Sequence, residues 1–154
     1  MIVYLFIIGG IFLTDQWIKN YIEKNKKVNK KTPILGGRII ITNHHNEGAI
    51  LNFMEKKPNI IKGIACITFG YVIILLGQVL SKRRGCLMKF GISMIAGGGF
   101  SNLYDRFKRG YVVDYFIINY KKLKKVIFNI ADICIFAGAF FMLIGELLKS
   151  KVFK

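Results

Sequence analysis

An uncharged run of 19 residues, from position 63 to 81, constrains the fold more than any other stretch of this chain. At about 1.5 Å of rise per residue, a helix of this length is about long enough to cross the hydrocarbon core of a bilayer. Three basic residues, Lys82, Arg83 and Arg84, follow it directly. The run therefore predicts a membrane-spanning helix that ends at a charged surface.

Three further apolar stretches have a comparable length and cover residues 2–18, 86–104 and 126–148. The hydrophobic content of 53% and the mean hydropathy of +0.43 indicate an integral membrane protein. We predict an all-α membrane fold with a single domain over residues 1–154. It has four transmembrane helices and a small β element between the first two.

Small residues recur every seven positions on two of these stretches. They are Gly63, Gly70 and Gly77 in the second stretch, and Ala131, Gly138 and Gly145 in the fourth. Small side chains let neighbouring helices approach closely in a membrane. Both sets therefore predict a close-packing seam.

The segment between the first two spans, residues 20–59, is rich in lysine, asparagine and turn residues and is expected to lie outside the lipid. Within it, residues 38–42 are largely β-branched and predict a short strand, with residues 49–53 as its partner across a turn at 46–48. Residues 111–118 are apolar but too short to cross the bilayer, so we expect them to dip into its interface.

The formal net charge of +16 narrows the choice of partner. The basic residues lie in clusters between the apolar stretches, for example at residues 121–125. Clusters beside membrane spans favour anionic lipid headgroups over nucleic acid. Neither a cysteine nor a carboxylate lies at a ligand-like spacing to both His44 and His45, so no metal site is predicted.

Two carboxylates stand out because each lies in or beside an apolar stretch. Asp114 and Asp132 are 18 residues apart, and the lysine-rich turn between them is short enough to return the chain to the same membrane face. Acids beside lipid are costly and usually functional. We expect Asp132 on the order of 10 Å inside the fourth helix, on the same face as Asn129. Two nearby carboxylates that share a proton supply the base and the acid that peptide hydrolysis without a metal requires.

Two other interpretations of these acids stay open on the residues alone. Asp114 pairing with a basic side chain and Asp132 bonding to helix ends would give a non-catalytic four-helix membrane protein. A small transporter or proton relay uses similar acids, although no inverted repeat relates the two halves of the chain. Asp15 and Lys19 are four residues apart, and their spacing alone favours an ion pair near a helix end.

Four motifs then occur in a fixed order along nearly the whole chain. They are Asp15-x-x-x-Lys19, Asn46-x-Gly48-Ala49, Asn102-x-x-Asp105-Arg106 leading to Gly110-x-Val112-Val113-Asp114, and Phe128-Asn129-x-Ala131-Asp132. With four apolar spans, this set resembles the lipoprotein signal peptidase family, also called signal peptidase II.

The resemblance implies a monomeric aspartyl endopeptidase of the bacterial cytoplasmic membrane, without a metal or cofactor. Its substrates would be diacylglyceryl-modified prolipoproteins, cut just before the lipidated cysteine. The catalytic aspartates would be Asp114 and Asp132. The residues that would shape the site or bind substrate are Asp15, Lys19, Asn46, Gly48, Asn102, Asp105, Arg106, Asn129 and Ala131.

The chain departs from the family pattern at Ile50, Leu51 and Ser101. These departures concern the substrate-facing loop and a packing seam, so they affect the expected substrate range more than the chemistry. The resemblance also implies an active site near the outer membrane surface. The positive-inside rule indicates the opposite orientation. Residues 19–62 and 106–125, on the active-site side, contain 17 basic residues, whereas residues 82–89 and 149–154, on the other side, contain 7. We follow the resemblance, because a signal peptidase acts on the translocated side of its substrate.

Overall fold

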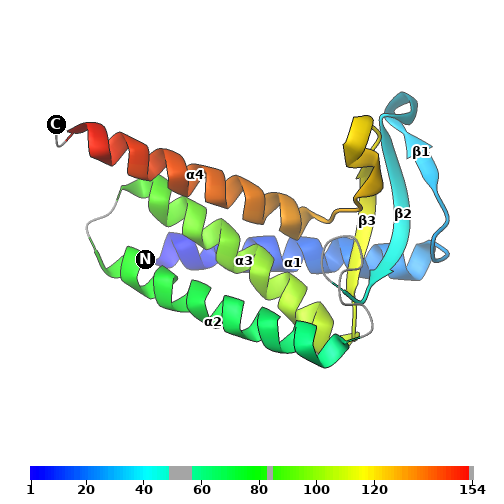
Figure 1. Cartoon of the computed structure of the whole chain (residues 1–154), viewed down its shortest axis with the longest axis horizontal. Coiled ribbons are helices and arrows are strands. Elements are labelled where there is room, and N and C mark those ends of the chain that lie inside the picture. The colour runs from blue at the N-terminus through cyan, green and yellow to red at the C-terminus, as the bar shows by residue number, and fades with distance from the viewer. Residues whose placement is uncertain (49–56, 83–84, 153–154) are drawn as a thin grey trace.

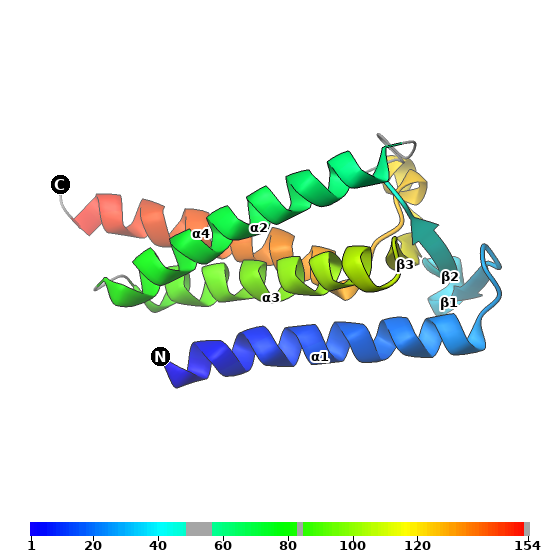
Figure 2. The same cartoon turned by 90° about the horizontal axis from the view of Figure 1, so that it is seen from below.

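A bundle of helices carries a small sheet across one of its ends (Figures 1 and 2). The computed structural model describes residues 1–48, 57–82 and 85–152. Within them the chain forms α1 (Ile2–Asn25), α2 (Pro58–Ser81), α3 (Cys86–Lys108) and α4 (Ile130–Val152). Among the described residues, three helical segments are long and apolar enough to span a membrane: Ile2–Asn25, Asn59–Ser81 and Ile130–Lys149. The all-α membrane fold is thus confirmed.

The helix α3 lies against all three other helices, which explains why its sequence is less apolar than theirs. Its residues Ile92, Ser93 and Ala96 are buried, so they face protein and not lipid. A helix enclosed in this way does not need an apolar surface on every side. The predicted third span therefore exists as a helix, and neighbouring helices cover much of it.

The small-residue seam predicted on α4 is confirmed, because α3 and α4 approach each other closely along it. A Cβ atom added at Gly138 would lie 2.5 Å from the carbonyl oxygen of Gly91, and one added at Gly98 would lie 2.5 Å from that of Ala131. The prediction of a close-packing seam on α2 is wrong. A Cβ atom added at Gly63, Gly70 or Gly77 would meet no atom of another residue within 4 Å. Regular spacing shows that residues share a face, and only packing decides what that face meets.

In the part of the chain that the structure describes, the sheet has three antiparallel strands in the order β1-β2-β3: β1 (Thr32–Ile34), β2 (Ile39–Asn46) and β3 (Val112–Ile118). The short 3₁₀ helices η1 (Leu35–Gly37) and η3 (Lys121–Lys125) lie beside it in the chain. The strand expected at residues 38–42 is confirmed as β2, and its expected partner at 49–53 lies outside the described residues. The segment expected to dip into the membrane interface instead forms β3, because its β-branched and aromatic residues pair with β2.

The helix α4 starts at Ile130, later than the predicted position 126. The backbone N–H and C=O of Phe116 pair with those of Phe128 over 3.0 and 2.8 Å, which keeps the chain extended until Asn129. Asp132 therefore lies in the first turn of the helix. The expectation of a site about 10 Å inside the helix is wrong, because a sheet pairing fixes where the helix begins.

Candidate active site

Asp114 from β3 and Asp132 from α4 are joined by asparagine side chains. Nδ2 of Asn129 donates to Oδ1 of Asp114 over 2.7 Å, and Nδ2 of Asn46 donates to its Oδ2 over 2.9 Å. Nδ2 of Asn102 donates to Oδ1 of Asp132 over 2.9 Å. The backbone N–H of Asn129 donates to Oδ2 of Asp132 over 3.2 Å. Asn129 therefore bonds to both carboxylates.

Local structure places Asn129 where it can do this. Its side-chain Oδ1 accepts the backbone N–H of Asp132 over 2.9 Å, while its own N–H donates to the Asp132 carboxylate. This reciprocal arrangement is a capping box at the start of α4. The expected common face of Asn129 and Asp132 is thus observed, as the first turn of a helix.

Strand pairing places the other partner of Asp114. His44 of β2 lies opposite Asp114, and Asn46 lies opposite Val112. Residues two apart on a strand share a face, so Asn46 reaches Asp114 diagonally across the pair. An irregularity in the register between Ile41 and His44 sets this alignment.

The environment of Asp114 favours its protonated form. The residue is 3% exposed. Burial, and to a smaller extent the charge of Asp132, raise the pKa of its carboxyl from 3.8 to about 7. Hydrogen bonds from Asn46 and Asn129 and the charge of Lys19 lower that pKa by smaller amounts. A carboxyl with such a pKa exchanges its proton near neutral pH, as acid–base chemistry requires.

A second, fully buried polar network supports this pair. Nζ of Lys19 lies 2.7 Å from Oδ2 of Asp15 and 3.0 Å from Oδ2 of Asp105, and all three side chains are inaccessible to solvent. Nζ of Lys19 also donates to Oδ1 of Asn102 over 2.9 Å. The ion pair expected between Asp15 and Lys19 is thus present, but its expected position near a helix end is wrong, because α1 continues to Asn25 and both residues are buried.

The remaining predicted residues join the same region. The N–H of Ala131 donates to Asp15 over 3.3 Å, and Oδ1 of Asn46 accepts the N–H of Gly48 over 3.1 Å. The carbonyl of Gly48 accepts a bond from Nη2 of Arg106 over 3.3 Å. Nη1 of Arg106 donates to the carbonyl of Asn102 over 3.2 Å. These bonds connect β2 to the end of α3 beside the two carboxylates.

Sequence reasoning did not select four further residues of the network, which are Gln16, Ser101, Arg109 and Tyr115. Nε2 of Gln16 donates to Asp105 over 3.0 Å, and Arg109 forms an ion pair with Asp105. The hydroxyls of Ser101 and Tyr115 donate to Asp15 over 2.6 and 3.1 Å. Of these four, only Arg109 could have been predicted from spacing, because it lies four residues after Asp105 and a helix brings such residues together. The departure at Ser101 thus adds a hydrogen bond to the network.

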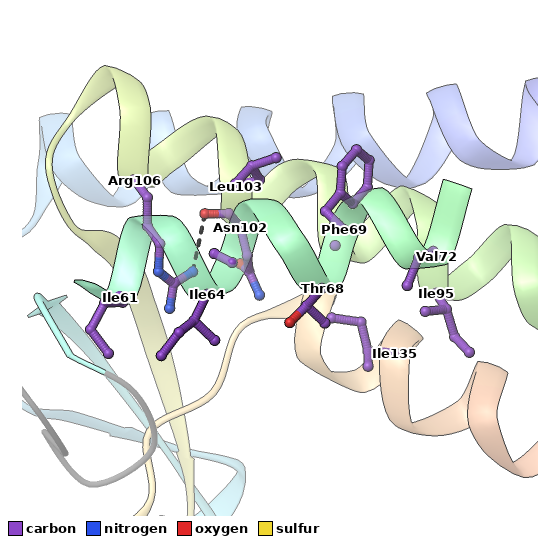
Figure 3. Close-up of a pocket in the computed structure, with 12 residues that line it drawn as sticks. Ile61, Ile64, Thr68, Phe69, Val72, Ile95, Asn102, Leu103, Arg106 and Ile135 are labelled. Atoms are coloured by element: carbon purple, nitrogen blue, oxygen red, sulfur yellow. Dashed lines mark hydrogen bonds between the residues drawn. The ribbon is translucent and has the colours of Figure 1, made fainter. Parts of the chain in front are cut away.

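A cavity of about 300 Å³ opens beside the site between α2, α3 and α4 (Figure 3). Asn102 and Arg106 lie together toward one end of it, joined by their hydrogen bond, and Val72 and Ile95 lie toward the other. Most of the other lining residues are apolar, namely Ile61, Ile64, Ala65, Phe69, Leu103 and Ile135, with Thr68 and Gly99. The cavity can therefore hold an apolar group that presents a polar group to Asn102 and Arg106.

Fold and site define a multi-pass membrane enzyme whose polar centre lies where a surface sheet meets a helix bundle. Comparison of the sequence with protein families identifies the family: the family model described as signal peptidase (SPase) II matches residues 7–148. The chain therefore belongs to the signal peptidase II family and is a peptidase.

Individual relatives agree with this assignment. The chain is 35% identical over 148 residues to a lipoprotein signal peptidase of Lactiplantibacillus plantarum, covering 96% of this chain and 95% of the relative. It is also 35% identical to one of Caldicellulosiruptor bescii, with 88% and 85% covered. A solved bacterial membrane enzyme superimposes with a TM-score of 0.88 at 25% identity, covering 100% of this chain and 93% of that structure.

Proposed function

We propose that this chain is a monomeric aspartyl endopeptidase that removes the signal peptide from diacylglyceryl-modified prolipoproteins, cutting just before the lipidated cysteine. It would act in the bacterial cytoplasmic membrane, with its site near the outer surface. The observation that carries the proposal is the double contact of Asn129, whose side chain bonds to Asp114 and whose backbone bonds to Asp132. Such contacts hold two carboxylates in one site despite their repulsion.

Charge balance supports a shared proton. The described network contains four carboxylates, Asp15, Asp105, Asp114 and Asp132, and three cationic side chains, Lys19, Arg106 and Arg109. If all seven were charged, the network would carry one excess negative charge in surroundings of low dielectric constant. One proton held between Asp114 and Asp132 makes the network neutral. A pair with one proton has one base and one acid.

The proposed reaction follows from that state. The ionised carboxylate takes a proton from water as the water attacks the scissile carbonyl carbon, and the protonated carboxyl donates to the carbonyl oxygen. As the tetrahedral intermediate collapses and the C–N bond breaks, the carboxyl that took the proton from water gives it to the departing amine. The other carboxylate takes a hydroxyl proton from the intermediate, so the pair again holds one proton. The two aspartates titrate as a pair, so the acid and base roles belong to the pair and not to one residue.

The cavity supports a lipidated substrate. Its apolar lining suits an acyl chain or apolar side chains of a signal peptide, and such a substrate would enter sideways from the bilayer. The guanidinium of Arg106 and the amide of Asn102 lie on the wall nearest the carboxylates, where they can donate to a substrate carbonyl. Ile50 and Leu51, expected at the rim, lie outside the described residues.

The test is to compare the purified parent with Asp114→Asn, Asp132→Asn and the double variant, using a diacylglyceryl prolipoprotein and following signal-peptide release on a gel. Asparagine keeps the shape of aspartate but cannot exchange the proton, so each single variant should lose about 10² to 10⁴ in rate. The double variant should be scarcely slower than either single one, because the two residues act as a unit.

Glu146→Gln supplies the matched control, because it changes an exposed carboxyl to an amide near the far end of α4. It should cleave at the parental rate. Near-parental cleavage by either aspartate variant would make that residue structural and would favour the non-catalytic or proton-relay interpretation of the pair.

A further inference from the structure

Two turns meet at one end of the sheet, where Ile39 of β2 pairs with Ile118 of β3. This end is opposite to the one that holds Asn46 and Val112. The first turn contains η1 and Arg38, and the second runs from Asn119 through η3. The N–H of Asn119 donates to the carbonyl of Arg38 over 2.9 Å, and its side-chain Nδ2 donates to the carbonyl of Gly37 over 2.9 Å. These bonds make residues 35–38 and 119–125 a single unit, which we call the sheet tip.

The sheet tip exposes apolar side chains outside the helices. Leu35, Tyr120 and Leu123 are 69%, 59% and 43% exposed. Leu35 and Lys121 also have left-handed backbones, with φ of 50° and 42°. Residues other than glycine adopt this conformation at a cost in free energy. The turns that carry these exposed apolar side chains thus contain backbones of raised free energy, and water is a poor partner for the side chains themselves.

The same unit is strongly basic. Arg38, Lys121, Lys122, Lys124 and Lys125 are all exposed. The sequence has no acidic residue from position 24 to 46, and Asp114, which is buried, is the only one from 106 to 131. Positive charge mixed with exposed aliphatic and aromatic groups is the composition of segments that bind at a membrane surface.

The position of the sheet tip matches that chemistry. The strands run across the helix axes at one end of the bundle, and the tip projects sideways past the start of α4 (Figure 1). A bundle that spans a bilayer would thus carry the tip over the neighbouring lipid. Since η3 ends five residues before Ile130, the tip lies close along the chain to the end of a span.

We propose that the sheet tip docks on anionic phospholipid headgroups of the bilayer in which the protein resides. The basic side chains pair with the phosphates, while Leu35, Tyr120 and Leu123 enter the interface between headgroups and acyl chains. This inference goes beyond peptide cleavage and depends only on the membrane location of the chain. An acidic segment of a substrate is the competing occupant, and the experiment below separates the two.

The experiment measures how near the tip lies to lipid headgroups in the full-length protein. Cys66, Cys86 and Cys134 are replaced by serine, and Tyr120→Cys is labelled with a small fluorophore. The protein is placed in nanodiscs that contain a lipid with a nitroxide on its headgroup, either in phosphatidylcholine or in phosphatidylcholine mixed with phosphatidylglycerol. Quenching should be stronger with phosphatidylglycerol and should weaken as salt is added, because salt screens exposed charges.

The charge variants test the cause. Each lysine near an anionic surface raises the binding constant on the order of fivefold. The double variant Lys122→Gln/Lys124→Gln should therefore reduce the ratio of docked to free tip about 25-fold. Lys122→Arg/Lys124→Arg should keep the parental quenching. The matched control Lys82→Gln/Lys149→Gln removes two exposed lysines at the other end of the bundle and should also keep it.

Equal quenching in the two lipid mixtures would overturn the proposal, as would an unchanged lipid response in the Lys122→Gln/Lys124→Gln variant. If that variant binds an acidic substrate peptide more weakly, and the label does not respond to lipid, the sheet tip binds substrate and not headgroups. No cleavage is measured in the quenching experiment, so its failure would leave the proposed peptidase mechanism standing. Inactive aspartate variants can be used in it equally well.

Discussion

The ammonium group of Lys19 donates to Oδ1 of Asn102 over 2.9 Å, and this bond fixes which way the amide of Asn102 points. With its oxygen turned to Lys19, the amide presents its Nδ2 to Asp132 and accepts a bond from Asn129. A buried cation on α1 therefore orients the polar groups that hold the carboxylate pair on β3 and α4.

The first prediction concerns that cation. Lys19→Met leaves Asp15 and Asp105 buried without their common partner, and breaking a buried ion pair in this way costs about 3–5 kcal/mol. The unfolding midpoint in detergent should fall strongly. Adding Asp15→Asn should recover part of the loss, because it removes a buried charge that has lost Lys19, whereas Asp105 keeps its ion pair with Arg109. A Lys19→Met protein as stable as the parent would mean that the pair contributes nothing to the fold.

The second prediction concerns pH. Burial and the charge of Asp132 raise the pKa of Asp114 from 3.8 to about 7. The folded state then binds this proton more tightly than the unfolded chain, so the stabilisation is fully present below pH 3.8 and is lost as the pH rises to about 7. The loss amounts to roughly 4 kcal/mol at most, and Asp114→Asn should lack it.

The measurement is the free energy of unfolding of the parent and of Asp114→Asn at several pH values. The difference between the two curves reports the titration of the coupled pair Asp114 and Asp132, since groups away from the pair titrate alike in both proteins. Parallel curves between pH 4 and 7 would contradict a raised pKa at Asp114.

The third prediction concerns the helix seam. A methyl group added by Gly138→Ala would lie 2.5 Å from the carbonyl oxygen of Gly91, so α3 and α4 must separate, at a cost of about 1–3 kcal/mol. The same change at Gly77 meets no neighbour and should leave stability unchanged or raise it slightly. Thermal unfolding of the two variants in one detergent provides the comparison. Equal midpoints would show that the contact is not tight in solution.

The fourth prediction concerns the cavity. Ala65→Phe places a ring in the space between α2, α3 and α4 and should raise KM for a lipidated substrate, with a smaller effect on kcat, because it removes binding space away from the reacting groups. Cys66→Phe adds the same ring at the next position, which is exposed and does not line the cavity. Equal kinetics for the two variants would place the substrate elsewhere.

The fifth prediction concerns orientation. Lys30→Cys on the sheet side and Ser81→Cys at the opposite end, each in a cysteine-free background, are treated with an impermeant thiol reagent on intact cells. If the site lies near the outer surface, position 30 should be labelled and position 81 should not. The reverse pattern would support the orientation indicated by the positive-inside rule.

Much of this protein could be predicted from sequence, because the relevant signals are local. The uncharged run at residues 63–81 predicts a span by length and composition alone, and the structure contains it as α2. The four ordered motifs predict the family. Asn129 and Asp132 were expected on one face because they are three residues apart, which a helical turn brings together.

Tertiary structure decided the features that depend on partners far away in the chain. The hydroxyls of Ser101 and Tyr115 reach Asp15 across 86 and 100 residues, and no local pattern selects those pairs. The pairing of Phe116 with Phe128 delays α4 and moves Asp132 to its first turn. Evenly spaced glycines form a seam on α4 but face no neighbour on α2. The physical reason is the same in each case: spacing determines which side chains share a face, and long-range packing determines what that face meets.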